Sequence, residues 1–184
     1  MRHPARPLHV ATAAGAMVHH GFELAAGVGL VFQPYLGLAG ASAMWGTLFS
    51  AWVVVSMRGS RRWDPMLAFA AGMSLGAAVL HFSLWPWSVR RGLPWLREAE
   101  GLRPEHLPAY NAVLYGWASL AAAALAFETP RRSRVWALAG FAATFPLRRT
   151  ARDHFRWIRE EARTNPAWWN RALHDTTIQP SFDR

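Results

Sequence analysis

Charged side chains are almost absent from four long stretches of this 184-residue chain. Residues 8–57 contain one, Glu23, and residues 65–89, 106–127 and 135–147 contain none. The 20 basic side chains, all arginine, and most of the 11 acidic ones therefore lie in the segments between these stretches. Since about 20 apolar residues cross the ~30 Å hydrocarbon core of a bilayer, this pattern predicts an all-α, polytopic transmembrane helix bundle of four or five spans in the cell membrane. It excludes a soluble fold, a disordered chain and a nucleic-acid-binding protein.

Prolines and basic loops divide the uncharged stretches into separate helices. Pro34 disfavours a helix that continues through it, and Pro65 suits the first turn of a new one. The four predicted spans cover approximately residues 8–32, 36–57, 65–85 and 109–127. A fifth segment, 134–147, has an uncharged part of 13 residues, which is only ~20 Å long as a helix. It either crosses a locally thinned bilayer or lies shallow in it, and we expect a short span.

Arginines in short loops predict the orientation, because such loops stay on the cytoplasmic side of a membrane. With the N-terminus in the cytoplasm, the turn between the first two spans, which has no charge, faces outward. The arginines that then face inward are Arg2, Arg6, Arg58, Arg61, Arg62, Arg131, Arg132 and Arg134. We therefore expect a multi-pass protein with a cytoplasmic N-terminus. Its arginine- and alanine-rich composition is typical of a GC-rich bacterial genome.

A basic tail, residues 148–184, follows the predicted membrane bundle of residues 1–147. Four apolar side chains in the tail repeat at helical spacing and so share one helix face: Ala151, Phe155, Ile158 and Ala162. The tail is therefore predicted to be an amphipathic helix, cytoplasmic or interfacial. Its apolar face either lies at the membrane interface, where the arginines bind anionic headgroups, or packs on the protein's own loops.

Small side chains recur at every fourth position on three of the predicted spans. Lipid tails remove the hydrophobic drive for helices to associate, so close backbone approach at small residues holds a membrane bundle together. The stripes are Ala68, Gly72 and Gly76; Ser42, Gly46 and Ser50; and Ala112 and Gly116. They predict tight helix packing, either within one chain or in a homo- or hetero-oligomer.

The first predicted span carries the side chains best suited to chemistry. Ionisable groups inside a membrane are costly, so each one is a candidate functional residue. Glu23 lies four residues after His19 and three after His20, which lets its carboxylate meet either imidazole on one face of the helix. A carboxyl group paired with an imidazole supplies both a proton donor and a proton acceptor.

Depth estimates from the 1.5 Å helical rise predict which aromatic residues surround Glu23. Counted from Phe32 as the outer end of its helix, Glu23 lies ~14 Å deep and His19 ~20 Å deep. Counted from the outer ends of their own helices, the depths are ~12 Å for Trp45, ~8 Å for Tyr115, ~10 Å for Trp117 and ~6 Å for His81. Tyr110 and Asn111 are also expected near the outer opening.

These residues predict a membrane-embedded acid–base enzyme, an isomerase or cyclase, that acts on an apolar isoprenoid- or sterol-like lipid. Aromatic faces accommodate such a substrate and stabilise developing positive charge. The predicted catalytic residues are Glu23, His19, His20 and Tyr115. The predicted substrate-binding residues are Trp45, Trp117, His81, Tyr110 and Asn111. The expected partners are membrane lipids and the apolar substrate, and no metal or cofactor is expected.

The His19-x-x-x-Glu23 spacing on a membrane helix resembles one element of the emopamil-binding-type sterol isomerases, which are also small multi-span proteins. The resemblance covers five of the 184 residues. It implies an isomerase that acts on a sterol-like lipid.

The sequence leaves three alternatives open. His19, His20 and Glu23 could serve only as hydrogen-bonding groups between helices, in a non-enzymatic accessory subunit or lipid-binding module. A haem needs axial histidines at one depth, and the estimates separate His19 from His81 by ~14 Å. A proton-coupled carrier would use Glu23 as its protonation site, although no internal repeat or second mid-membrane acid is evident.

Overall fold

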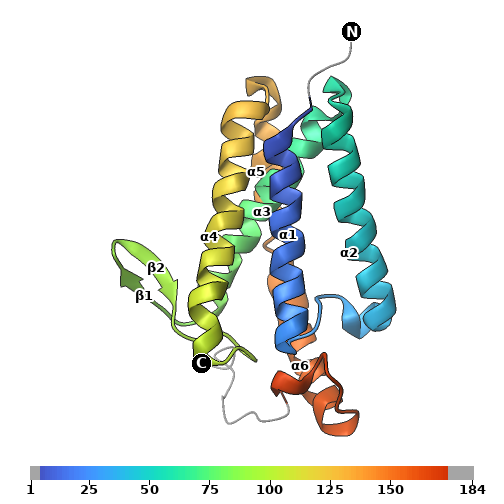
Figure 1. The fold of residues 1–184 in the computed structure, drawn as a ribbon, viewed down its shortest axis with the longest axis vertical. Coiled ribbons are helices and arrows are strands. Elements are labelled where there is room, and N and C mark those ends of the chain that lie inside the picture. Colours follow the sequence, from blue (N-terminus) through green and yellow to red (C-terminus); the bar gives the residue numbers. More distant parts are fainter. Residues whose placement is uncertain (1–4, 174–184) are drawn as a thin grey trace.

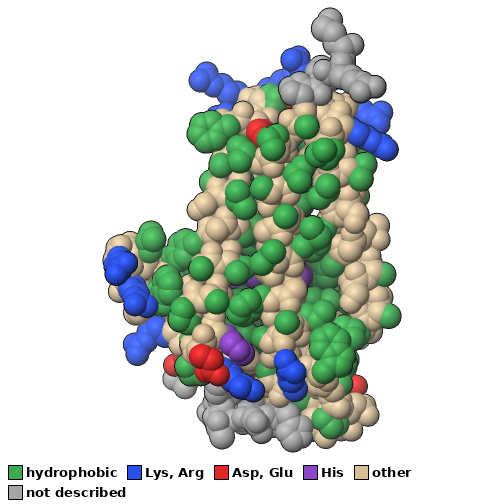
Figure 2. Space-filling model, viewed as in Figure 1, with side chains coloured by type: hydrophobic (Ala, Val, Ile, Leu, Met, Phe, Trp, Pro, Cys, Tyr) green, Lys and Arg blue, Asp and Glu red, His purple; other side chains and the backbone are tan. Residues whose placement is uncertain are grey.

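Helices make up most of the described chain, which comprises residues 5–173 of a computed structural model. The helices are α1 (Pro7–Ala26), α2 (Gln33–Arg58), α3 (Asp64–Leu84), α4 (Leu107–Ala123), α5 (Val135–Ala142) and α6 (Leu147–Thr164). Figure 1 shows them as an elongated bundle. Three helical segments, residues 33–58, 61–84 and 104–128, are long and apolar enough to cross a membrane. Figure 2 shows hydrophobic side chains over the body of the bundle, and arginines toward its two ends and on the part that protrudes at the left.

Helix α1 ends at Ala26, well before the predicted end of the first span. Gly27 follows in the left-handed conformation at φ 86°, and its backbone N–H donates to carbonyls of the preceding turn. Glycine adopts this conformation without steric cost, so it commonly terminates helices in this way. The predicted span 8–32 is therefore wrong at its C-terminal end. As a result, Glu23 lies three residues from the end of its helix.

The other three predicted spans agree with helices to within a few residues. The span predicted at 36–57 is α2, which has Pro34 in its first turn. The span predicted at 65–85 is α3. The span predicted at 109–127 is α4, continued by the π-helical turn Ala124–Glu128.

The connection between α3 and α4 contains a β-hairpin, so the expectation of an all-α chain needs one correction. Strands β1 (Trp87–Arg90) and β2 (Leu93–Leu96) pair antiparallel around the turn Arg91-Gly92. Both turn residues have positive φ, 52° and 80°, which matches the twist of a tight hairpin. Asn111 holds β2 on α4, because its side chain accepts from the Leu96 N–H at 2.9 Å and donates to the Leu96 carbonyl at 3.2 Å.

Helix α5 packs closely on α3 along one of the predicted small-residue stripes. A Cβ atom added at Gly72 would lie 2.7 Å from Cα of Ala137, and one added at Gly76 would lie 2.9 Å from the carbonyl oxygen of Phe141 in α5. The two backbones can approach this closely only because the side chains are missing. A Cβ atom added at Gly46 or Gly116, from the other two stripes, would have no neighbouring atom within 4 Å. These two glycines therefore do not bring described helices together.

Helix α6 follows α5 toward the end of the bundle opposite the N-terminus (Figure 1). The four apolar side chains predicted to share a face in the tail are all buried: Ala151, Phe155, Ile158 and Ala162. They belong to the same hydrophobic core as residues of the long helices, and Phe155 packs edge-on against Trp85. The protein's own chain therefore covers this apolar face, as the second of the two alternatives for the tail predicts.

A histidine on α6 fixes this helix to the turn after α1. His154 is buried, and its Nε2 lies 3.1 Å from the carbonyl oxygen of Val28. Its Nδ1 has no hydrogen-bond partner among residues 5–173. Burial lowers the pKa of His154 below its ordinary value of 6.5, although the hydrogen bond to Val28 and the charge of Glu23 oppose the shift.

We expect acidification below about pH 6.5 to weaken the docking of α6. Below this pH, His154 takes up a proton in the unfolded chain. In the native chain the added proton would lie on a buried nitrogen that has no hydrogen-bond acceptor, so protonation favours the unfolded chain. The free energy of unfolding therefore falls as the pH falls. Thermal unfolding in detergent at about pH 7.5 and about pH 5 measures the effect. His154→Gln is the control, since glutamine still donates a hydrogen bond but does not titrate. An equal fall of Tm in both proteins would assign the effect to other histidines.

Candidate functional site

Glu23 lies at the centre of a polar cluster to which three helices contribute. Tyr110 of α4 donates a hydrogen bond to Glu23 Oε1 at 2.6 Å. The same oxygen lies 3.6 Å from Nε2 of His19 on α1 and 3.7 Å from Nε2 of His81 on α3. The side chains of Glu23 and the two histidines are at most 14% exposed. The structure therefore brings four of the predicted site residues together around one carboxylate.

The depth estimates from the sequence are wrong for this cluster, because they were counted from Phe32. The imidazole centroids of His19 and His81 lie 4.9 Å apart, whereas the estimates separated the two residues by ~14 Å. Since α1 ends well before Phe32, Glu23 and His81 each lie three residues before the last residue of their helix. Tyr110 lies in the first turn of α4. The cluster therefore lies toward one end of the bundle rather than midway along it.

Aromatic rings cover His19 and His20 of α1. The ring of Trp117 stacks on His19, with centroids 5.0 Å apart and an interplanar angle of 19°. The ring of Trp45 lies 4.3 Å from that of His20. Nδ1 of His20 lies 2.9 Å from the carbonyl oxygen one turn earlier, which fixes this imidazole beside Trp45. Both tryptophans therefore lie against histidines of the predicted site.

A cavity of about 380 Å³ adjoins the cluster. Most of its wall consists of apolar side chains from α2 and α3, and side chains of α6 also line it. The predicted site residues on the wall are His19, His20, Glu23, Trp45, His81, Tyr110 and Trp117. Mainly apolar walls with a few converging polar groups, at a volume within the ~300–1,000 Å³ range, are typical of small-molecule sites.

The cavity wall also includes two ionisable residues outside the predicted site, Glu100 and His154. Glu100 precedes α4 and pairs with Arg159 of α6. His154 lies three residues after Ala151 and four before Ile158. This helical spacing places it on the buried face of α6, so its burial could be predicted from the sequence. No local pattern marks Glu100, because its burial depends on how the loop before α4 folds.

Tyr115 and Asn111 are not brought to the cavity. The Tyr115 hydroxyl donates to the carbonyl of Pro94, and Asn111 binds the backbone of β2. Since each helical residue advances by about 100°, Tyr115 points about 140° away from Tyr110. The predicted catalytic role of Tyr115 and the substrate-binding role of Asn111 are therefore corrected: within the described chain both side chains hold the hairpin on α4.

Three atoms of the cluster are close enough together to hold a metal ion. Among residues 5–173, one imidazole nitrogen each of His19 and His81 and one carboxylate oxygen of Glu23 all lie within 4.8 Å of one another. A haem does not fit between the same two histidines, because a carboxylate oxygen lies within 3.7 Å of both Nε2 atoms, where the porphyrin would have to pass. The cluster therefore suits a single ion or a proton-transfer site.

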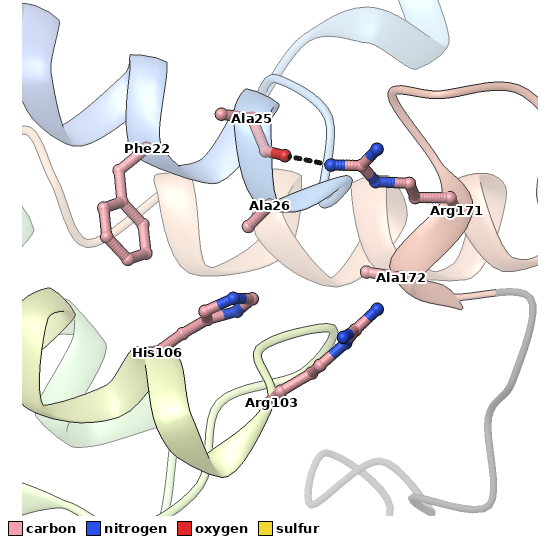
Figure 3. Close-up of a pocket in the computed structure, with 7 residues that line it drawn as sticks. All are labelled: Phe22, Ala25, Ala26, Arg103, His106, Arg171 and Ala172. Carbon is pink, nitrogen blue, oxygen red and sulfur yellow. Dashed lines mark hydrogen bonds between the residues drawn. The ribbon is translucent and has the colours of Figure 1, made fainter.

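A second pocket, of about 300 Å³, lies at the end of α1. Figure 3 shows Phe22, Arg103, His106 and Arg171 around it. Arg171 donates to a C-terminal carbonyl of α1 at 2.8 Å, a group that has no partner within its own helix. The Phe22 ring also lies 5.5 Å from that of Tyr110. This pocket therefore lies next to the Tyr110 side of the cluster.

Comparisons of the chain with models of protein families, with curated proteins and with solved structures found no match.

Proposed function

We propose that this protein is a multi-pass membrane enzyme that transfers a proton on an apolar, isoprenoid- or sterol-like lipid, as an isomerase or cyclase does. The observation that carries the proposal is the position of the Glu23 carboxylate, which contacts Tyr110, His19 and His81 at the wall of a mainly apolar cavity. Such a site combines a proton acceptor, proton donors and mainly apolar walls.

The proposed membrane arrangement is a bundle of four or five spans. The three long apolar segments support it, with α1 beside them and residues 134–147, of which α5 forms only the first eight-residue helix, as a short fifth span. In this proposal the N-terminal end faces the cytoplasm, because short loops there carry arginines, and α6 lies at the opposite interface. The arginines of α6 are partly neutralised there, in the pairs Arg156–Asp153, Arg159–Glu100 and Arg163–Glu160.

Each member of the cluster has its own part in the proposed proton transfer. Glu23 exchanges a proton with a carbon atom of the substrate, and the 2.6 Å hydrogen bond from Tyr110 fixes the orientation of its carboxylate. His19 and His81 exchange protons with Glu23 after a small movement, since 3.6 Å and 3.7 Å are slightly longer than a hydrogen bond. The aromatic wall, which includes Trp45, stabilises positive charge on the substrate.

Replacing Glu23 with glutamine is expected to abolish this proton transfer and to leave the fold intact. Purified protein would be incubated in D₂O with a total extract of isoprenoid and sterol lipids, and mass spectrometry would identify lipids that gain deuterium. Loss of a general acid–base group lowers a rate by roughly 10²–10⁴-fold, so Glu23→Gln should show almost no exchange. Its Tm should change little, because glutamine keeps an oxygen that accepts from Tyr110.

Tyr115→Phe is the matched control, since the Tyr115 hydroxyl bonds the hairpin and not the cluster. This variant is expected to exchange deuterium at the rate of the native protein. The proposal is wrong if the native protein deuterates no lipid and Glu23→Gln lowers only the unfolding temperature. The cluster would then consist of hydrogen-bonding groups that hold helices together.

A further inference from the structure

We propose that His19, Glu23 and His81 bind one divalent transition-metal ion of the zinc or ferrous class. The ligands are two imidazole nitrogens and one carboxylate oxygen, supplied by α1 and α3. This inference goes beyond the proposed function, which requires only proton transfer. Ion binding can also be measured without any substrate.

The orientation of His81 leaves a lone pair directed at the cluster. Its Nδ1 lies 2.6 Å from the carbonyl oxygen of Ala77, an acceptor, so this nitrogen carries the proton. In the neutral imidazole, Nε2 then has a lone pair and no hydrogen. This nitrogen lies 3.7 Å from Glu23 Oε1. Two electron-rich atoms therefore face each other in a buried site, an arrangement that a cation between them stabilises.

His19 faces the same carboxylate oxygen, and its Nδ1 has no hydrogen-bond partner among residues 5–173. Its Nε2 lies 3.6 Å from the same oxygen of Glu23, too far for a good hydrogen bond. Its ring is held by stacking on Trp117 at 5.0 Å. Two nitrogens and one oxygen therefore converge on a single point without hydrogen bonds among themselves.

The separations between these atoms fit a first-row metal ion after small movements of side chains. Metal–nitrogen and metal–oxygen bonds of about 2.0–2.2 Å at tetrahedral angles put ligand atoms roughly 3.4 Å apart. Two of the observed separations are 3.6 Å and 3.7 Å, and all three lie within 4.8 Å. The site would contract on binding, by movements of the three side chains.

The surroundings of the ligands support this assignment. Histidines that bind metal ions usually donate their second N–H to a carbonyl or carboxylate, and carboxylate ligands are hydrogen-bonded in turn. His81 is bonded in this way to Ala77, and Glu23 accepts from Tyr110. Two histidines and one carboxylate are also the ligand set of catalytic zinc sites and non-haem iron sites, which keep a position open for water or substrate. The adjoining cavity provides room for that position.

Metal analysis of protein purified without a polyhistidine tag tests this inference. The protein would be stripped with EDTA, incubated with Zn²⁺ in excess, desalted and measured by mass spectrometry for bound zinc. We expect about one ion per chain in the native protein and at least a tenfold loss in Glu23→Gln and in His81→Ala. Incubation with Co²⁺ should give visible absorption bands of a protein-bound ion, which both variants lose.

His106→Gln is the matched control, because His106 lines the second pocket and not the cluster. It should keep about one ion per chain. If His81→Ala fails to fold, Glu23→Gln alone decides, since it keeps the hydrogen bond from Tyr110. Zinc below about 0.1 per chain in the native protein, or equal zinc in native protein and Glu23→Gln, overturns the inference. If the native protein exchanges deuterium but binds no zinc, the proposed function is supported and this inference fails. If it binds zinc but exchanges no deuterium, this inference is supported and the proposed function fails.

Discussion

Replacing Gly72 with valine is expected to destabilise the packing of α5 on α3 by at least about 3 kcal/mol, the upper end of the usual cost of overpacking a core. A Cβ atom at this position would lie 2.7 Å from both Cα and the carbonyl carbon of Ala137. These are backbone atoms, so no side-chain rotation relieves the contact and the two helices must separate. Gly140 makes the reciprocal contact, since a Cβ there would lie 2.8 Å from the carbonyl carbon of Phe69. Gly140→Val should therefore have a similar effect.

Gly46→Val and Gly116→Val are the matched controls for this prediction. They make the same chemical change on α2 and α4, where a Cβ atom would meet nothing within 4 Å. Valine is slightly better than glycine within a helix, so both controls should keep the native free energy of unfolding to within about 0.5 kcal/mol. Unfolding in detergent, monitored by circular dichroism, measures all four variants. A Gly72→Val protein as stable as the controls would contradict the close contact between α3 and α5.

The small-residue stripe of α3 could be predicted from the sequence, but its partner could not. The spacing of Ala68, Gly72 and Gly76 shows that one face of the helix permits close approach, and two other stripes show the same pattern. Which stripe is used depends on which helix lies beside it in the fold. Helix α5, which fills this position, is short, and its own pattern does not identify α3 as its neighbour.

The candidate site could be predicted in part, because its core is local in sequence. His19 and Glu23 meet within one helix, and the spacing of four residues is enough to predict this. The approach of His81 and Tyr110 depends instead on where the helices end. Gly27 and Gly29, both with positive φ, end α1 and fold the following turn, so a depth scale that begins at Phe32 fails. Glycine directly after a helical pattern is a recognised stop signal, and it would have corrected the estimate.

A buried ion pair joins the start of α1 to the start of α3. The guanidinium group of Arg6 contacts the carboxylate of Asp64, and these side chains are 10% and 2% exposed. Arg6 also donates to the carbonyl of Ser60 at 3.4 Å, and its backbone N–H donates to that of Ser56 at 3.1 Å. Through these contacts Arg6 connects the start of α1 to the end of α2, to the loop after it and to the start of α3.

Asp64→Ala is expected to lower the free energy of unfolding by about 3–5 kcal/mol, because removal of one partner leaves a charge buried and unpaired. The double variant Arg6→Met/Asp64→Leu should recover more than half of this loss, since an apolar pair of similar volume has no charge to desolvate. Recovery should be incomplete, because Asp64 also interacts favourably with the N-terminus of α3.

Arg103→Ala is the control, as it breaks a pair with Glu105 whose side chains are 74% and 62% exposed, and it should cost at most about 1 kcal/mol. Denaturant unfolding in detergent gives these values, and a double variant no more stable than Asp64→Ala would show that the lost charge pairing is not the cause. The comparison thus separates the cost of an unpaired buried charge from the contribution of the ion pair itself.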